Sequence, residues 1–270
     1  MAITADFHNH TDFSSDCKIP MEEMIQKAIS LNMTHLCFTE HMDPDYPVSA
    51  DGLTFLLDTE AYRNRFLQLR EKYSSRINLL WGVELGIQPH LYDRLKSYTS
   101  SHPFDFIIAS SHVLYGEDPY YSSFFENRKE EEVYEDYFKC ILSNIKNFSD
   151  FDVYGHLDYI VRYGPNKDTR YSYEKYRDIF DEILKTLIQN QKGLEVNTGG
   201  LKYGLKDLHP LQDILKRYKE LGGQIITIGS DAHSPDYLQH RFSYVREVLT
   251  SFGYRYYSVF QNRTCSFLPL

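Results

Sequence analysis

Histidine and carboxylate residues recur in short motifs, each at the end of an apolar run of the chain. In chain order the motifs are His8-Asn9-His10, Glu40-His41, Glu84, Ser111-His112, Gly155-His156-Leu157-Asp158, Glu195-Val196-Asn197 and Ser230-Asp231-Ala232-His233. Six of the 11 His fall in them, more than random placement would give. Residues i and i+2 of a strand point to the same side, so His8 and His10 can direct two imidazoles at one point. Imidazole and carboxylate without thiolate suit zinc, manganese or iron in a hydrolytic site, so the pattern predicts a metal centre.

Seven β-like runs and the helical segments between them must position these motifs. The predicted strands are Ala5–His10, His35–His41, Leu79–Gly86, Phe104–His112, Asp152–Tyr159, Leu194–Thr198 and Gln224–His233. A period near 3.6 in the apolar residues predicts helices over Met21–Asn32, Glu60–Tyr73, Tyr92–Thr99, Glu130–Asn147, Tyr173–Leu187 and Leu211–Leu221. For the last helix we expect Pro210 in the first turn and Gly222 just past the end. The alternation of strand and helix is typical of βα units around a parallel sheet.

Such an alternation can form an open doubly wound sheet or a closed barrel. A barrel brings the C-terminal ends of all its strands to one mouth, whereas an open sheet collects them only at a switch point. Nearly every predicted strand carries His, Asp or Glu at that end, so we favour an α/β fold of the TIM-like barrel type. No segment has the composition of a linker, and we therefore predict one domain over residues 1–270.

Composition excludes several classes of partner. The chain carries 29 Lys+Arg against 38 Asp+Glu, a formal net charge of −9, which argues against nucleic-acid binding through bulk charge. No apolar run approaches the roughly 18–20 residues of a membrane helix, and residues 1–6 lack the basic and apolar regions of a signal peptide. The four cysteines lie far apart, as reduced thiols of a cytosolic protein do. We therefore expect a cytoplasmic protein with no nucleic-acid or membrane partner.

In this order and with these spacings, the motifs resemble those of the polymerase-and-histidinol-phosphatase (PHP) family, and the resemblance spans His8 to His233. It implies an irregular seven-stranded (β/α)7 barrel with two to three divalent metal ions at its C-terminal mouth. The implied ligands are His8, His10, Glu84 and Asp231 for one metal, the bridging Glu84 with His112 and His156 for a second, and Asp16, His41 and His233 for a third. Many family members have a histidine where this chain has Asp16. The resemblance further implies hydrolysis of a phosphomonoester, with L-histidinol phosphate of histidine biosynthesis as the expected substrate.

The chemistry of such a site follows from its cations. Two cations about 3.5–4 Å apart can hold a bridging water, lower its pKa toward about 7 and neutralise phosphate oxygens during an in-line displacement. We therefore expect a metal-bridging hydroxide as the nucleophile, with Glu84 as the bridging carboxylate. No activated Asp, Ser or Cys suggests a covalent phospho-enzyme. Either Asp231 or a metal-bound water would protonate the leaving alkoxide.

Phosphate also requires a cation from the protein, and the planar fork of arginine suits phosphate oxygens. Arg162 lies six residues after His156 and keeps the same strand parity if the extended run continues. Lys202 follows Gly199-Gly200, beyond the end of the sixth strand. We predict that both bind phosphate, against the alternative that each is an ordinary surface cation.

The segment Val113–Arg128 is rich in Tyr and Phe, and loops of this length are often lids or binding segments. Its carboxylates, Glu117 and Asp118, could meet an aminoalkyl-imidazole substrate, and we take Glu117 as a substrate-binding candidate. The alternative is a loop packed on the flank of the barrel. Four further residues, Glu40, Asp158, Glu195 and Asn197, are expected to orient metal-bound imidazoles.

Three other functions compete with a small-molecule phosphatase. PHP-type modules also process nucleotides and DNA ends, but this chain lacks a basic, aromatic-interleaved stripe. A non-catalytic metal-binding module should have lost ligands, and only Asp16 is unusual. Metal-assisted hydrolysis at carbon often uses a carbamylated lysine, and no predicted strand end presents one. The composition allows a monomer or a homodimer.

Overall fold

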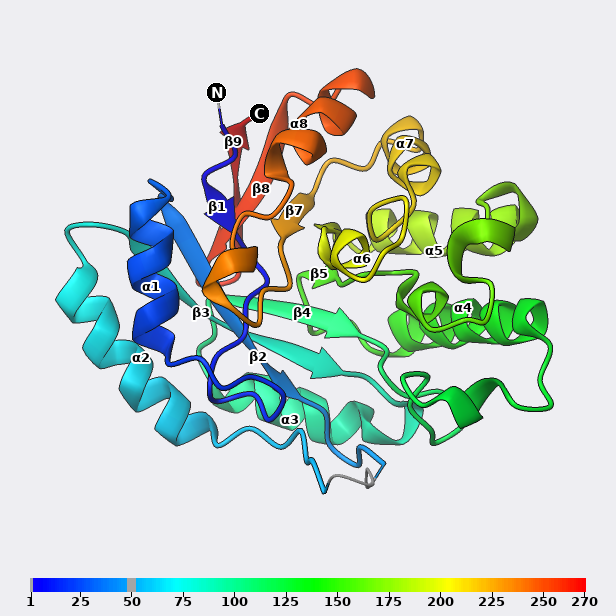
Figure 1. The fold of residues 1–270 in the computed structure, drawn as a ribbon, viewed down its shortest axis with the longest axis horizontal. Coiled ribbons are helices and arrows are strands. Elements are labelled where there is room, and N and C mark those ends of the chain that lie inside the picture. The colour runs from blue at the N-terminus through cyan, green and yellow to red at the C-terminus, as the bar shows by residue number, and fades with distance from the viewer. Residues whose placement is uncertain (1, 48–51) are drawn as a thin grey trace.

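The computed structural model describes residues 2–47 and 52–270. Within these residues, seven parallel strands form one sheet in the order β1 to β7, with helices around it (Figure 1). The strands are β1 (Ala5–Asp6), β2 (His35–Met42), β3 (Asn78–Gly86), β4 (Phe106–Ser110), β5 (Val153–Tyr154), β6 (Gly193–Asn197) and β7 (Ile226–Gly229). Met1 and residues 48–51 of the predicted domain 1–270 lie outside the described residues, and the single-domain assignment stays a prediction.

The first and last strands of the sheet meet and close a barrel. The Phe7 N–H donates to the Ile228 carbonyl at 2.9 Å, and the Asp231 N–H donates to the His8 carbonyl at 2.9 Å. Asn9 forms a parallel bridge with Ala232 just beyond the two strands. The predicted α/β TIM-like barrel is therefore confirmed, and the two-residue strands β1 and β5 make it irregular.

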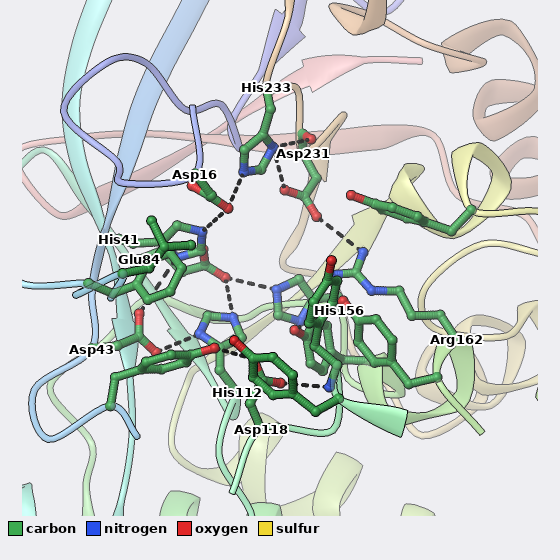
Figure 2. Close-up of a pocket in the computed structure, with 18 of the residues that line it drawn as sticks. Asp16, His41, Asp43, Glu84, His112, Asp118, His156, Arg162, Asp231 and His233 are labelled. Atoms are coloured by element: carbon green, nitrogen blue, oxygen red, sulfur yellow. Dashed lines mark hydrogen bonds and ion pairs between the residues drawn. The ribbon is translucent and has the colours of Figure 1, made fainter. Parts of the chain in front are cut away.

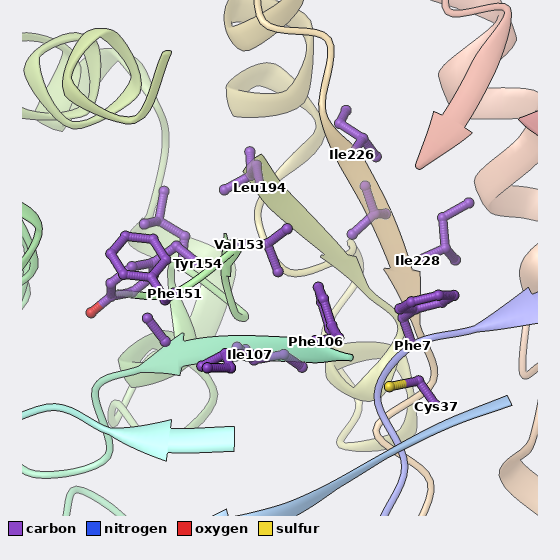
Figure 3. Packing of buried hydrophobic residues seen from close by; sticks show 14 of the residues in the cluster. Phe7, Cys37, Phe106, Ile107, Phe151, Val153, Tyr154, Leu194, Ile226 and Ile228 are labelled. Atoms are coloured by element: carbon purple, nitrogen blue, oxygen red, sulfur yellow. The ribbon is translucent and has the colours of Figure 1, made fainter. Parts of the chain in front are cut away.

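The strands are apolar because helices cover the outside of the barrel and side chains fill its inside. In β3, every residue from Leu79 to Gly86 is buried. Phe7 and Phe106 pack edge to face with ring centroids 5.1 Å apart, and both lie near Cys37 in the core (Figure 3). A Cβ atom added at Gly82 would lie only 2.8 Å from Cys37 Sγ, so this close packing leaves room for glycine alone.

The six predicted helices are present with shifts at their ends, the largest at Tyr173, where the α-helix begins only at Arg177, and the helix Phe242–Ser251 was not predicted. The α-helices are α1 (Met21–Ser30), α2 (Thr59–Tyr73), α3 (Tyr92–Ser101), α4 (Glu130–Asn147), α5 (Arg177–Gln189), α6 (Gly199–Lys202), α7 (Gln212–Glu220) and α8 (Phe242–Ser251). The 3-10 helices are η1 (Pro89–Leu91), η2 (Ser122–Phe125), η3 (Tyr159–Arg162), η4 (Lys167–Arg170), η5 (Glu174–Tyr176) and η6 (Pro235–Tyr237). Pro210 precedes the N-cap residue Leu211, so its predicted first-turn position is wrong, whereas Gly222 follows the end of α7 with φ 94° as expected. In the described part of the chain, no helix is long and apolar enough to cross a membrane.

Four predicted strands are longer than the observed ones, for one physical reason. The runs Ala5–His10, Phe104–His112, Asp152–Tyr159 and Gln224–His233 continue past β1, β4, β5 and β7, because their polar ends leave the ladder and turn into the mouth. The sequence analysis also missed an antiparallel hairpin, β8 (Tyr256–Gln261) with β9 (Thr264–Pro269). Arg263 in its turn contacts Asp152 just before β5, with Nε 2.6 Å from the carboxylate, so the hairpin covers the end of the barrel opposite the mouth.

Candidate metal centre

The C-terminal ends of the strands bring the nine predicted metal ligands together at the mouth. Figure 2 labels Asp16, His41, Glu84, His112, His156, Asp231 and His233 among them. His41 and Glu84 lie inside β2 and β3. The other seven lie on the segments that leave β1, β4, β5 and β7. This placement follows from a parallel barrel, in which every strand ends at the same rim.

Glu84 lies at the centre of the cluster and is completely buried. Its Oε1 atom lies 3.2 Å from His112 Nε2 and 2.8 Å from His156 Nε2. Its Oε2 atom lies 3.2 Å from His8 Nε2 and 3.0 Å from His41 Nδ1. Burial opposes ionisation of Glu84, but the imidazoles of His8 and His112 hold its pKa well below the ordinary value. The carboxylate is therefore ionised and can face two cations at once.

The remaining ligands extend the cluster on the His8 side. His8 Nε2 lies 3.1 Å from His10 Nε2, and Asp231 Oδ1 lies 3.8 and 3.6 Å from these two atoms. Asp16 Oδ2 lies 3.1 Å from His233 Nε2 and 3.7 Å from His41 Nε2. The residues predicted for each of the three metals are thus neighbours in space.

The donor set fits divalent metal ions. In groups such as Glu84, His112 and His156, the ligand atoms lie within 4.8 Å of one another. Among the described residues, Glu84 Oε2 and His41 Nδ1 are buried and have no hydrogen-bond partner. Buried polar atoms without partners are costly, and a cation between the imidazoles and the carboxylates would satisfy them.

Other buried polar groups orient the ligands. Glu195 Oε1 lies 2.6 Å from His8 Nδ1, while Glu195 Oε2 accepts the His156 N–H at 2.8 Å. Asn197 donates its side-chain amide to Glu195 at 3.2 Å. Glu40 accepts the Ser14 hydroxyl at 2.6 Å, and that hydroxyl oxygen lies 3.1 Å from His10 Nδ1. These contacts place Glu195, Asn197 and Glu40 where the sequence analysis expected orienting groups, with Glu40 acting through Ser14.

Asp43 belongs to the same group, and the sequence analysis missed it. Its Oδ1 atom lies 2.6 Å from His112 Nδ1, and its Oδ2 atom lies 3.6 Å from His41 Nδ1. A Cβ atom at Gly86 would lie 1.8 Å from Asp43 Oδ1, so this glycine leaves the space that the carboxylate occupies. The signal in the sequence was the i+2 spacing from His41, which puts Asp43 on the same side of the chain.

Asp158 lies elsewhere than predicted. Its Oδ1 atom lies 2.5 Å from Nδ1 of the buried His209, and its Oδ2 atom accepts the Tyr171 hydroxyl and the Leu211 N–H. It therefore fixes the segment that precedes α7 and contacts no predicted ligand. The chain enters η3 directly after Asp158, so this residue leaves the direction of the strand that carries His156.

A cavity of about 370 Å³ opens above the ligands. Arg162 lines it, although the argument that placed it there was wrong, since Arg162 ends η3 and lies outside any strand. Its guanidinium carbon lies 4.3 and 4.4 Å from the ring centroids of Tyr159 and Tyr203, and its Nη1 lies 3.9 Å from Asp231 Oδ2. Lys202, the last residue of α6, also lines the cavity, with Nζ 4.3 Å from the ring centroid of Tyr237.

Glu117 does not face the cavity. Leu114 and Glu117 exchange two backbone hydrogen bonds of 3.0 Å in a tight turn, and the exposed Glu117 carboxylate pairs with Arg128. The next residue, Asp118, points the other way and lines the cavity. The segment Val113–Arg128 has features of both a binding segment and a loop packed on the barrel. Phe124 is buried in the core, while Asp118 is in the cavity wall.

Comparison with known proteins is consistent with this geometry. Residues 6–199 match the family model of the PHP domain. A probable histidinol-phosphatase of Clostridium acetobutylicum is 36% identical over 233 residues, which are 86% of this chain and 87% of that protein. A histidinol-phosphatase of Lactococcus lactis subsp. lactis is 34% identical over 230 residues, 84% of this chain and 83% of its own. A crystal structure of histidinol phosphate phosphatase from Lactococcus lactis subsp. lactis, complexed with zinc, L-histidinol and phosphate, superimposes with a TM-score of 0.87 at 29% identity, covering 98% of this chain and 99% of that one. The chain therefore belongs to the PHP domain family.

Proposed function

We propose that this chain is a metal-dependent phosphomonoesterase that hydrolyses L-histidinol phosphate to L-histidinol and phosphate, a step of histidine biosynthesis. The observation that carries the proposal is the convergence of nine imidazole and carboxylate side chains, seven of which line a cavity that also contains the Arg162 side chain, itself only 8% exposed. The relatives named as histidinol-phosphatases, and the structure that holds L-histidinol and phosphate, support the choice of substrate.

Two to three divalent ions fit the ligand groups, with zinc, manganese and iron as candidates. We assign the first to His8, His10, Glu84 and Asp231, the second to Glu84, His112 and His156, and the third to Asp16, His41 and His233. When bound, such ions supply Lewis acidity, which lowers the pKa of water and neutralises charge on phosphate oxygens. The zinc in the similar structure supports this assignment without deciding which metal this chain uses.

Arg162 binds the phosphate group. The rings of Tyr159, Tyr163 and Tyr203 lie within 5.0 Å of its guanidinium carbon and exclude water from it. A charge in such a low-dielectric setting attracts phosphate oxygens more strongly than it would in water. Its Nε atom is buried without a partner among the described residues, which leaves a donor for the ligand. Lys202 adds a second positive charge to the same cavity.

Asp231 moves the proton. Burial opposes its ionisation, but His8, His233 and Arg162 hold the pKa of Asp231 well below the ordinary value, so the carboxylate starts unprotonated. It can accept a proton from the attacking water and return it to the leaving alkoxide as the phosphorus–oxygen bond breaks. Glu84 keeps the imidazoles that contact its two carboxylate oxygens in fixed positions during this step.

We further propose a cytoplasmic enzyme that acts on a small molecule as a monomer or homodimer. Its four cysteines, all in the described residues, are free thiols, which supports a reducing compartment.

The test is phosphate release by the metal-loaded chain from L-histidinol phosphate, a nucleotide monophosphate and an aryl phosphate. We expect kcat/KM for L-histidinol phosphate to lie within the usual enzyme range and well above the other two values. A chelator should abolish the activity. A histidine outside the ligand cluster should be dispensable. His90→Ala should therefore keep the wild-type activity, because His90 is exposed and pairs with Asp45. Equal, feeble rates on all three esters would refute the proposed substrate.

A further inference from the structure

The carboxylates that line the cavity differ in whether a positively charged group lies beside them. Its carboxylates are Asp16, Asp43, Glu84, Asp118 and Asp231. Three of these are assigned to metal, and Asp43 is held by His112. Within the described residues, Asp118 is the cavity carboxylate that has no ion pair with a histidine, lysine or arginine.

Asp118 is held in place by two neutral donors. The Tyr46 hydroxyl donates to its Oδ2 atom, and the Tyr120 N–H donates to its Oδ1 atom at 2.8 Å. A carboxylate offers about four acceptor positions, so two remain for a ligand. The residue is only 6% exposed, although it lies in the cavity wall.

A buried carboxylate without a cation is unfavourable, because water no longer solvates its charge. Burial accordingly raises the pKa of Asp118 above its ordinary value, even though Tyr46 and the Tyr120 N–H stabilise the ionised form. A ligand that brings a positive charge to this carboxylate would offset the cost of burying it.

The cavity thus contains charges of both signs. Arg162 and Lys202 supply positive charge for a phosphate, and the Asp118 carboxylate supplies negative charge close to His112. Tyr159 and Tyr163, whose ring centroids lie 5.1 Å apart, line the same cavity and add an aromatic wall. A phosphoester that carries an ammonium group a few bonds from its phosphate matches this division of charge, whereas a purely anionic nucleotide does not.

We propose that Asp118 binds the ammonium group of the substrate and selects aminoalkyl phosphoesters over esters that lack a positive charge. This inference rests on the proposed function for the identity of the substrate, but its chemistry concerns the ammonium group alone. The residue takes the role that the sequence analysis gave to Glu117, from the neighbouring position.

The variant that tests it is Asp118→Asn, which removes the charge and nearly keeps the shape. Its Oδ1 atom can still accept the Tyr120 N–H, and its amide NH2 can donate to the Tyr46 hydroxyl oxygen in place of the bond that Tyr46 donates to Asp118. Glu126→Gln is the matched control, because Glu126 is an exposed carboxylate on the same segment. Hydrogen bonds to charged groups correspond to about 10- to 100-fold in an equilibrium constant. We therefore expect kcat/KM for L-histidinol phosphate, divided by that for an aryl phosphate, to fall about 10- to 100-fold in Asp118→Asn. The Ki of L-histidinol as a product inhibitor should rise by a similar factor, more than the Ki of inorganic phosphate.

A second pair of ligands separates this inference from the proposed function. 2-Aminoethyl phosphate and ethyl phosphate differ in the ammonium group, and each can compete with the aryl phosphate. The wild-type chain and Glu126→Gln should bind 2-aminoethyl phosphate more tightly, and Asp118→Asn should lose at least tenfold of that preference. If the wild type fails to favour L-histidinol phosphate, the proposed function is wrong, and the inhibitor pair still reports on Asp118. An unchanged preference, or an equal loss for every ligand, would overturn the assignment of Asp118. Should Asp118→Asn fail to fold, Asp118→Ser gives the same comparison.

Discussion

Replacement of Gly86 by alanine tests whether Asp43 positions a metal ligand. The new Cβ atom would lie 1.8 Å from Asp43 Oδ1 and 2.4 Å from its Cγ, whereas Cβ contacts under 3.0 Å are essentially never seen. The carboxylate must therefore move by at least 1.2 Å (3.0 minus 1.8). That displacement breaks its 2.6 Å contact with His112 Nδ1.

The expected cost follows from the bond that is lost. A hydrogen bond to a charged group contributes about 1.5–3 kcal/mol, and loss of a group that orients a metal-bound histidine typically costs about 10- to 100-fold in metal affinity or activity. We therefore expect Gly86→Ala to weaken zinc binding about 10- to 100-fold and to lower kcat/KM. Competition with a chromophoric chelator measures the first quantity, and phosphate release measures the second.

A double-mutant cycle shows whether the effect passes through Asp43. Asp43→Ala removes the Oδ1 and Cγ atoms that Gly86→Ala would strike. Adding Gly86→Ala to Asp43→Ala should therefore cost little more, and the coupling should be nearly as large as the single effect. If Gly86→Ala costs the same in both backgrounds, Gly86 does not serve Asp43 and our reasoning is wrong. Melting temperatures of all variants check that the barrel stays folded.

Three further predictions concern the ligands and the phosphate site. Arg162→Ala should raise KM and lower kcat for the phosphoester, since a phosphate contact that tightens in the transition state affects both, and unchanged steady-state kinetics would contradict the assigned role. His156→Ala should abolish turnover while the circular dichroism spectrum stays that of the wild type, and full activity would remove His156 from the second metal. Burial lowers the pKa of His112, but Asp43 and Glu84 outweigh it and raise the pKa to about 10 in the metal-free protein. Zinc must then displace the proton of the His112 imidazole at pH 7, so the affinity for zinc should fall as the pH falls below about 10. Calorimetry in buffers of different ionisation enthalpy should show net proton release on zinc binding. Absence of proton release would refute the charged state of His112.

The residues proposed as metal ligands could be grouped from the sequence because each lies in a short motif at or just past the end of a strand. Spacing along a strand decides on which side a residue lies, and the parallel order of the strands decides that all their ends meet at one rim. The bounds of α4, Glu130–Asn147, follow directly from its apolar period. The strand ends were less predictable, since a polar residue that continues the alternation can equally leave the ladder. Arg162 shows the consequence, because it reaches the cavity from a 3-10 helix and not from the strand that parity suggested.

Local sequence patterns do not predict which carboxylates of the loops face the cavity. Glu117 and Asp118 are neighbours of the same chemistry, and the turn from Leu114 to Glu117 decides which of them faces the cavity. The hairpin of β8 and β9 is likewise held by contacts to distant segments, such as Ser258 with Ile226. Neither outcome follows from the residue types of these segments alone.

Residue types, order and spacing were sufficient to indicate the family, the barrel and the proposed metal ligands, because each of these depends on short motifs and on their order along the chain. Only the tertiary structure decided which polar groups from distant parts of the chain contact each other. Asp43 meets His112 across 69 residues because Gly86, on a third strand, leaves room for its carboxylate. Such contacts depend on how side chains from separate strands and loops share one close-packed volume, and no short-range pattern encodes that volume.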